Sequence, residues 1–339
     1  MGIKFLNKFL KNKCPDLFET INLIEYKNKT IAIDTSIYLY TYKTMYGSGW
    51  IKPFLKFLLC LQKNGIKCVF VFDSGAPIEK KEEQKQRYKH RKELEKKIDK
   101  MELAIEKYKK TKIIDEILLI NKNKEDIHMD KDGLNIKYVI NQVNKLKKQL
   151  ITINEIEINE AKKIFNILGI TYCDAHLEAE KLCALLCING KVDAVLSNDT
   201  DLIAYGTPYI LSNINIIKGT CIRICFSTLL NKLGLEQTNF LDFCIMCGTD
   251  YNKNIHIIGA KKSFNLITKY KNIDSISENV KMDASILNHL NVRKIYTQFD
   301  SNDIKTVAEI KLDNIKTPDF IKLKEYLHHN KIFFIFNQL

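Results

Sequence analysis

CVFVFD, residues 68–73, is one of three short apolar runs that decide the fold class. The other two are TIAID at residues 30–34 and VDAVLS at residues 192–197. Each run is almost continuous in apolar residues, a pattern typical of a strand that is buried on both faces of a parallel sheet. Segments such as 51–63 and 176–188 separate the runs and are expected to be helices. The alternation predicts an α/β fold with a mainly parallel central sheet.

Composition restricts the class of protein and the kind of partner. The chain has 339 residues and a formal net charge of +13. No apolar stretch approaches the ~20 residues that cross a bilayer, and charges interrupt the N-terminus where a signal peptide needs an apolar block. We expect a soluble intracellular protein without a membrane partner. The basic excess favours nucleic acid, although a solvated lysine-rich surface would give the same charge.

Residues 79–153 interrupt the alternation of strands and helices. Within them, residues 79–112 hold 14 Lys or Arg against 8 Asp or Glu. Apolar residues recur at steps of three and four over 94–108 and again over 136–153. Two such stripes joined by a polar turn near 121–133 predict a helical hairpin whose seams pack on each other. We interpret this segment as a basic helical insertion; a solvated spacer without function is the alternative.

All three predicted strands end on, or within two residues of, an aspartate: Asp34, Asp73 and Asp199, with Asp201 close behind. Ligands of parallel α/β sheets gather at the carboxyl ends of the strands. A single aspartate there is often only the N-cap of the next helix. Three strands that end alike favour a shared acidic site.

Glu178 and Glu180 open the predicted helix 176–188 and add to this acidic set. Residues two apart on a helix diverge by roughly 200°, so we expect them to reach different ions, or one ion directly and the other through water. Converging carboxylates raise one another's pKa values, and Mg²⁺ relieves that repulsion because hard dications prefer oxygen ligands. Two such ions can activate water and stabilise the leaving oxygen in phosphodiester hydrolysis.

Six ordered segments resemble the successive motifs of the flap endonuclease (XPG) family of 5′ nucleases. They are MGIKFLNKFL, IAIDTS, FVFDSGAP, LEAEKLCALL, VLSNDTDLIAYG and CIMCGTDYNKNIHIIGAKKSFNLI. The resemblance implies a PIN-like nuclease core with a basic helical arch and a C-terminal helical DNA clamp. It implies two Mg²⁺ ions, with Mn²⁺ as a substitute, and catalytic roles for Asp199 and Asp201. It also implies seven metal-site acids, all present here: Asp34, Asp73, Glu178, Glu180, Asp199, Asp201 and Asp250.

The same resemblance assigns residues to the DNA. Lys80 and Arg87 match a pair at the base of the arch that contacts the scissile phosphate, and Arg91 is a further arch residue. Their spacings of 7 and 4 would place all three on one helix face. Tyr40 matches an aromatic that stacks on the base beside the cut, with a core tyrosine as the alternative. Gly2 matches the N-terminal residue that lies near the active site.

Residues 248–270 look like two helices joined by a tight glycine turn and resemble the family's duplex clamp. Gly259 is kept there, and Lys261 and Lys262 are candidates for phosphate contact. The usual pattern has glycine where this chain has Ile257, and a β-branched residue is expected to resist a positive φ. A clamp is therefore predicted, but the substitution argues against the K⁺ ion that the family often binds there.

The chain is divided into an N-terminal nuclease region (1–78), the arch insertion (79–153), an internal nuclease region with the clamp (154–270) and a C-terminal helical region (271–339). The ending KIFFIFNQL lacks the spacing of a sliding-clamp motif, so no sliding-clamp partner is expected. The expected site of action is the nucleus or a viral replication site.

We predict a Mg²⁺-dependent 5′ flap endonuclease with 5′→3′ exonuclease activity. It is expected to act as a monomer on branched or gapped duplex DNA that carries a 5′ single strand. The alternatives are an exonuclease, bubble nuclease or junction nuclease of the same family, a 5′→3′ exoribonuclease, and a non-catalytic DNA-binding accessory protein.

Overall fold

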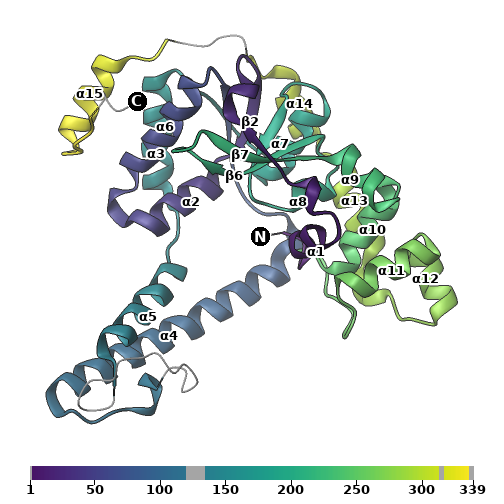
Figure 1. Ribbon diagram of the computed structural model, residues 1–339, viewed down its shortest axis with the longest axis horizontal. Coiled ribbons are helices and arrows are strands. Elements are labelled where there is room, and N and C mark those ends of the chain that lie inside the picture. The colour runs from purple at the N-terminus through teal and green to yellow at the C-terminus, as the bar shows by residue number, and fades with distance from the viewer. Residues whose placement is uncertain (1, 120–133, 313–316, 336–339) are drawn as a thin grey trace.

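The centre of the computed structural model, which describes residues 2–119, 134–312 and 317–335, is a seven-stranded sheet (Figure 1). The strand order is β1-β7-β6-β5-β2-β3-β4. The strands are β1 (Glu19–Asn22), β2 (Thr30–Asp34), β3 (Lys67–Phe72), β4 (Thr171–Asp174), β5 (Ala194–Leu196), β6 (Tyr209–Asn215) and β7 (Thr220–Cys225). From β6 to β4 all neighbours are parallel, and β7 and β1 add an antiparallel edge. The mainly parallel sheet is confirmed, and the three predicted strands are β2, β3 and β5.

Helices cover both faces of the sheet. The helices are α1 (Leu6–Lys13), α2 (Thr35–Tyr46), α3 (Ile51–Lys63), α4 (Lys81–Thr111), α5 (Ile136–Gln149), α6 (Glu155–Leu168), α7 (Ala179–Ile188), α8 (Asp201–Ala204), α9 (Phe226–Leu233), α10 (Gln237–Cys247), α11 (Ala260–Tyr270), α12 (Ile273–Val280), α13 (His289–Thr297), α14 (Ser301–Glu309) and α15 (Phe320–His329). Short 3₁₀ turns are η1 (Pro15–Leu17), η2 (Leu23–Tyr26), η3 (Gly47–Gly49), η4 (Ile78–Lys80), η5 (Glu116–Leu118) and η6 (Ser285–Leu287). Among the described residues, none of these helices has the length and apolar character needed to cross a bilayer.

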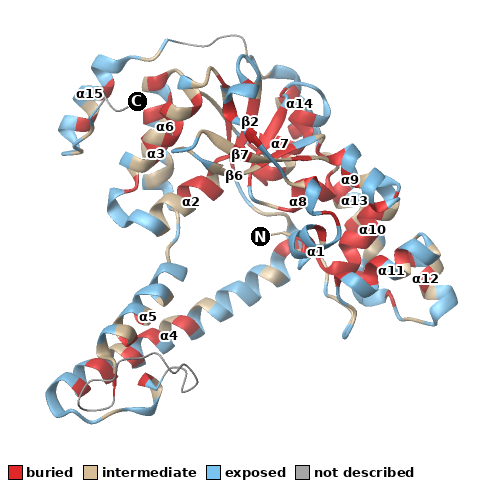
Figure 2. Ribbon diagram, viewed as in Figure 1, coloured by how far each residue is buried: buried red, intermediate tan, exposed pale blue. Residues whose placement is uncertain are grey.

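Alternate residues of each strand face opposite layers of the core. On β2, Ala32 packs with the apolar residues of α7, α8 and α10, whereas Ile31 and Ile33 pack with those of α2, α3 and α6. Figure 2 shows both layers as buried residues around the sheet. Helix α15 joins the second layer through Leu323 and Leu327, away from the other C-terminal helices. Burial of every central strand on both faces explains why those strands are almost continuously apolar.

Helices α4 and α5 form the predicted hairpin, which projects from the core as an arch (Figure 1). Its seam is a separate apolar cluster in which Met101 is fully buried and packs with residues such as Val139 and Val143. Ile153 was predicted to belong to this seam, and that prediction is wrong. It packs instead against the core layer of α3 and α6, because the chain has already left the hairpin when it reaches the start of α6. The whole of the predicted turn at 121–133 lies outside the described residues.

The prediction of two helices within 248–270 is also wrong, because only α11 forms there. Residues 248–259 are a loop between α10 and α11. Two asparagine side chains replace helical hydrogen bonds in this loop. The Oδ1 of Asn252 accepts from the backbone N–H of Thr249 at 3.2 Å, and its Nδ2 donates to the carbonyl of Ile245 at 2.9 Å. Asn254 donates to the carbonyl of Cys247. Such local side-chain hydrogen bonds compete with helix formation.

Candidate metal centre at the carboxyl edge of the sheet

The carboxyl ends of three strands bring together the aspartates that were predicted from the sequence. Asp34 is the last residue of β2, Asp73 follows β3, and Asp199 follows β5 after a short turn. Strand β2 pairs with both β3 and β5, so Asp34 lies between the other two along the sheet edge. Ser197 Oγ joins two of these ends by donating to Asp34 Oδ2 at 3.3 Å.

The remaining acids come from the elements that follow the strands. Asp201 begins α8, and Asp250 lies in the loop after α10. Glu178 is the N-cap residue of α7 and has an extended backbone, so only Glu180 lies within the helix. The predicted divergence of the two glutamates is therefore wrong, because it assumed helical geometry at both positions. Both carboxylates instead face the ammonium group of Lys80.

Lys80 is the counter-charge of this acidic group. Its Nζ contacts Glu178 Oε1, lies 3.4 Å from Glu180 Oε1 and lies 3.5 Å from Asp250 Oδ2. It also stands 5.1 Å from the ring centroid of Tyr251. Burial by itself would lower the pKa of Lys80, but the two glutamates raise it above its ordinary value. Lys80 is therefore held as a buried cation among the acids.

The acids remain under electrostatic strain in spite of Lys80. Burial raises the pKa of Asp34, and the charges of Glu180, Asp73 and Asp199 raise it further. Burial, followed by the charge of Asp199, raises the pKa of Asp201. The pKa of Glu180 is raised from 4.5 to about 8, chiefly by burial. One ammonium group does not offset this much buried negative charge.

The donor set fits a divalent cation. Asp34 Oδ1 and both carboxylate oxygens of Asp201 are buried without a hydrogen-bond partner, and unsatisfied hard oxygens at a strand edge are what Mg²⁺ binds. Within residues 2–119, 134–312 and 317–335, no three His, Cys, Asp or Glu side chains are arranged to hold an ion as they stand. In place of an ion, the ammonium group of Lys80 lies among three of the acids.

Arg87 reaches this centre, whereas Arg91 does not. A guanidinium nitrogen of Arg87 lies 3.0 Å from Asp250 Oδ2, and its Nε pairs with Glu83 on α4. Arg91 pairs with Glu95 at 3.3 Å and donates to the carbonyl of Leu150 at 2.6 Å, which ties α4 to the end of α5. The three basic residues therefore lie in two places. Lys80 and Arg87 lie at the candidate metal centre, and Arg91 lies at the base of the arch.

An open cleft of about 900 Å³ begins beside Asp250. On one side it is lined by Glu79 of η4 and Glu83 in the first turn of α4, and on the other by the loop that carries Lys253 and Ile257. The acidic centre is therefore open to a large substrate rather than closed around a small one. Buried carboxylates, a basic pair and an open approach together suit hydrolysis of a polymeric phosphodiester.

Gly2 lies against the same acids, as predicted. Its φ is +80°, and a Cβ there would stand 2.2 Å from Asp199 Oδ1 and 2.7 Å from Thr200 Oγ1. No side chain fits at that distance, and the backbone conformation itself favours glycine. The N-terminal segment therefore forms one wall of the candidate metal centre.

Two family models match this chain over more than half of its length. The XPG N-terminal domain matches residues 1–94, and the XPG I-region matches residues 169–250. The chain belongs to the XPG family of nucleases. Both matches contain acids of the candidate metal centre, and the segment between them contains most of the arch. The chain is therefore a nuclease, which is a hydrolase.

Individual relatives agree with this assignment. The chain is 33% identical over 342 residues to the probable RAD2-like endonuclease 369L of Invertebrate iridescent virus 6, covering 91% of this chain and 82% of the relative. It is 28% identical over 345 residues to flap endonuclease 1 of Heterostelium pallidum, covering 96% and 80% of the two chains. The solved catalytic core of Rad2 in complex with DNA substrate has the same fold, with a TM-score of 0.62 at 19% identity and coverage of 97% and 95%.

The loop that resembles the XPG duplex clamp differs from the sequence prediction at Ile257. Ile257 adopts a φ of +66°, so the expectation that a β-branched residue would resist this conformation is wrong. Its side chain is 73% exposed. The adjacent Gly259 has an ordinary negative φ and is the N-cap residue of α11. Lys261 and Lys262 follow in the exposed first turn of that helix.

Two tyrosines, Tyr40 and Tyr251, differ in exposure and in their contacts with the acids. Tyr40 on α2 is 39% exposed, so it is a surface aromatic and the core alternative does not apply to it. Tyr251, which was not assigned a role, donates a hydrogen bond to Glu178 Oε2 at 2.6 Å. Its position directly after Asp250 in the GTDY segment of this XPG-family chain was the only signal that could have singled it out.

Proposed function

We propose that this XPG-family nuclease is a Mg²⁺-dependent, structure-specific 5′ flap endonuclease that also has 5′→3′ exonuclease activity on DNA. The observation that carries the proposal is the set of buried, unsatisfied carboxylate oxygens at the carboxyl edge of the sheet. Similarity to flap endonuclease 1 along 96% of this chain supports the flap substrate. An enzyme with this activity would act in the replication, repair or recombination of DNA.

Two Mg²⁺ ions, replaceable by Mn²⁺, would be held by the seven acids. These acids are Asp34, Asp73, Glu178, Glu180, Asp199, Asp201 and Asp250. When bound, such ions polarise the phosphate and lower the pKa of water so that it becomes a nucleophile. The bound charge would also satisfy the carboxylates whose pKa values are raised by burial.

The chain's own cations would orient the phosphate. Lys80 and Arg87 both contact Asp250, so they lie at the entrance from the cleft to the acids. A lysine supplies a compact charge and an arginine a planar fork, and both suit negative charge that builds on a phosphate. Tyr40, exposed on α2, would stack on the base beside the cut.

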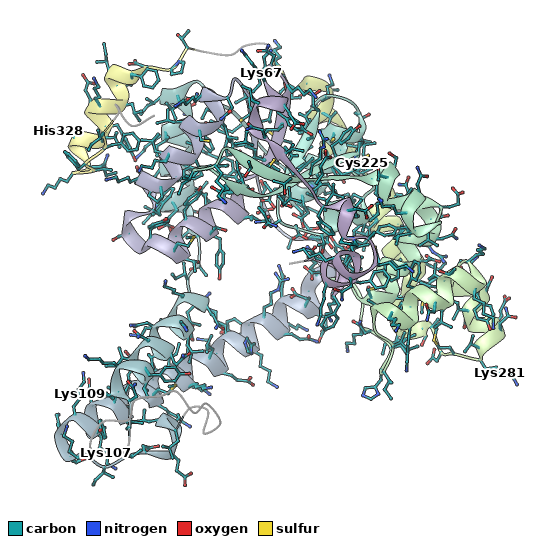
Figure 3. The ribbon with its side chains drawn as sticks, in the orientation of Figure 1. Lys67, Lys107, Lys109, Cys225, Lys281 and His328 are labelled. Carbon is teal, nitrogen blue, oxygen red and sulfur yellow. The ribbon has the colours of Figure 1, made fainter. Side chains whose placement is uncertain are left out.

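The rest of the DNA would lie on two elements. The 5′ single strand would pass beside the arch, whose far end carries Lys107 and Lys109 (Figure 3). The duplex would lie on α11, where Lys261 and Lys262 follow the loop 248–259 and contact phosphates. The positive φ of Ile257 removes the stated argument against a K⁺ ion at this loop. We further propose that the protein works as a monomer, and similarity to an iridescent virus endonuclease favours a viral replication site.

Cleavage of a matched substrate panel tests the proposal. The panel has a 5′ flap, a nicked duplex, a bubble, a four-way junction and a flap with an RNA strand, each labelled at the 5′ end. The expected result is preferential cutting of the 5′ DNA flap close to the junction in Mg²⁺, with slower release of mononucleotides at the nick. Preference for the bubble or the four-way junction would move the protein to another branch of the family, and preference for RNA would make it an exoribonuclease.

A further inference from the structure

Three tyrosine rings form a buried layer against the metal centre. Tyr205 ends α8, Tyr251 follows Asp250, and Tyr296 lies on α13. The ring centroids of Tyr205 and Tyr296 are 4.8 Å apart, and those of Tyr251 and Tyr296 are 5.5 Å apart. All three side chains are buried. Helix α13 lies outside both segments matched by the family models. Its Tyr296 packs on the rings of Tyr205 and Tyr251.

The hydroxyls of this layer differ in their partners. Tyr251 already donates to Glu178 Oε2 at 2.6 Å. The hydroxyls of Tyr205 and Tyr296 are buried without a hydrogen-bond partner, and so are both carboxylate oxygens of Asp201. Buried polar groups without partners are rare because leaving them unsatisfied is costly. Two donors and two acceptors therefore stand unsatisfied in one part of the core.

The backbone places these groups together. The amide of Tyr205 donates to the carbonyl of Asp201 at 3.0 Å, so the two residues are one helical turn apart. Side chains at this spacing share a helix face, and Tyr296 packs on the ring of Tyr205. Burial raises the pKa of Tyr296 most, and the charge of Asp201 is the next cause. Asp201, Tyr205 and Tyr296 are thus neighbours.

We propose that Tyr296 and Tyr205 are positioning residues, whose hydroxyls donate hydrogen bonds to the carboxylate of Asp201 and orient it toward the divalent cation. This inference rests on the proposed metal-dependent function. Tyr251 plays the same part for Glu178. Partners of metal ligands fix the orientation of those ligands, and their removal commonly weakens metal binding 10- to 100-fold.

Direct Mn²⁺ binding without DNA tests the proposal in the variants Tyr296→Phe and Tyr205→Phe. Phenylalanine keeps the ring packing and removes only the hydroxyl. The expected result is a Kd for Mn²⁺, measured from the electron paramagnetic resonance signal of the free ion, at least about tenfold higher in each variant. The matched control is Tyr326→Phe, which removes a tyrosine hydroxyl bond to Glu160 in the other core layer. It is expected to leave this Kd unchanged.

Cleavage measurements separate positioning from a structural role. In the Tyr296→Phe and Tyr205→Phe variants, the Mg²⁺ concentration for half-maximal single-turnover cleavage of flap DNA should rise. Saturating Mn²⁺ should restore the rate to within a few-fold of wild type.

Wild-type Mn²⁺ affinity in both variants overturns the proposal, and so does a lower Tm with unchanged affinity. If Tyr296→Phe does not fold, Tyr205→Phe decides by the same criteria. A wild-type protein that binds Mn²⁺ but cuts no flap contradicts the proposed function and leaves the positioning roles standing.

Discussion

At the scale of single residues, Gly2 is tightly constrained beside the candidate metal centre. We predict that Gly2→Ala lowers single-turnover cleavage of flap DNA at least about tenfold, because the added Cβ would overlap Asp199 Oδ1 at 2.2 Å. The matched control is Gly219→Ala in the turn between β6 and β7. Gly219 also has a positive φ, of +67°, but its Cβ would meet nothing within 4 Å. Wild-type cleavage by Gly2→Ala would contradict the prediction, and an equal loss in Gly219→Ala would show that the loss does not depend on displacement of Asp199.

The raised pKa of Glu180 predicts how the stability of the metal-free protein depends on pH. Its pKa is raised from 4.5 to about 8 in the folded protein, mainly by burial, so between these values the folded state binds more protons than the unfolded state. The stabilising effect of the neutral form is complete below about pH 4.5 and is lost as pH rises through about 8. We therefore expect the Tm of metal-free Glu180→Gln, minus the Tm of metal-free wild type, to increase as pH rises from 5 to 8.5.

Metal provides the control for this pH prediction. Saturating Mg²⁺ should remove most of the pH-dependent difference between Glu180→Gln and wild type, because a bound cation stabilises the ionised carboxylate. A difference in Tm that is constant across this pH range, measured by differential scanning fluorimetry, would contradict the raised pKa.

At the scale of elements, the arch depends on its apolar seam. Met101 is fully buried between α4 and α5 in a cluster that is separate from the core of the sheet. Met101→Ala should therefore cost about 2–5 kcal/mol of local stability without disturbing the metal centre. Hydrogen exchange in α4 and α5 should become faster, and cleavage of flaps should fall while Mn²⁺ affinity is retained. Exposed Leu103 on the same helix supplies the control variant Leu103→Ala. An unchanged cleavage rate in a Met101→Ala arch that exchanges faster would show that the arch is dispensable.

Helix α11 is the element predicted to hold the duplex. Each phosphate contact that is lost should lower the slope of log K against log salt concentration by about 1. We expect this change for Lys261→Ala and for Lys262→Ala, measured by fluorescence anisotropy with duplex DNA in Ca²⁺. Lys269→Ala, in the last turn of the same helix, should leave the slope unchanged. Equal slopes in all three variants would place the duplex elsewhere.

At the scale of the whole molecule, the centre of the fold could be predicted from the sequence, and its edge could not. Strands β2, β3 and β5 are buried on both faces and are therefore almost continuously apolar. Strand β1 buries only Ile21, so it carries no periodic signal, and its pairing with β7 joins distant parts of the chain.

Likewise, some residues of the candidate site could be predicted from the sequence and others could not. Aspartates that directly follow strands could be predicted from the strand pattern, whereas Asp250 required a motif because it lies in a loop. The convergence of Glu178 and Glu180 on Lys80 depends on the N-cap conformation of Glu178, which is set by tertiary contacts. Tyr296 packs on the ring of Tyr205 from a distant helix, and nothing near it in the sequence indicates its proposed role.

Single-turnover cleavage of a 5′ flap by wild type and by the Asp199→Ala and Asp201→Ala variants tests the central claim most directly. Wild type should cut near the junction in Mg²⁺ and not in EDTA. Each variant should lose cleavage by at least about a thousandfold, because the cations lose a ligand at the reacting phosphate. Affinity for the flap, measured in Ca²⁺, should change little in either variant. Cleavage by the variants at the wild-type rate, or cleavage by wild type without a divalent cation, would contradict the assignment of a metal-dependent nuclease.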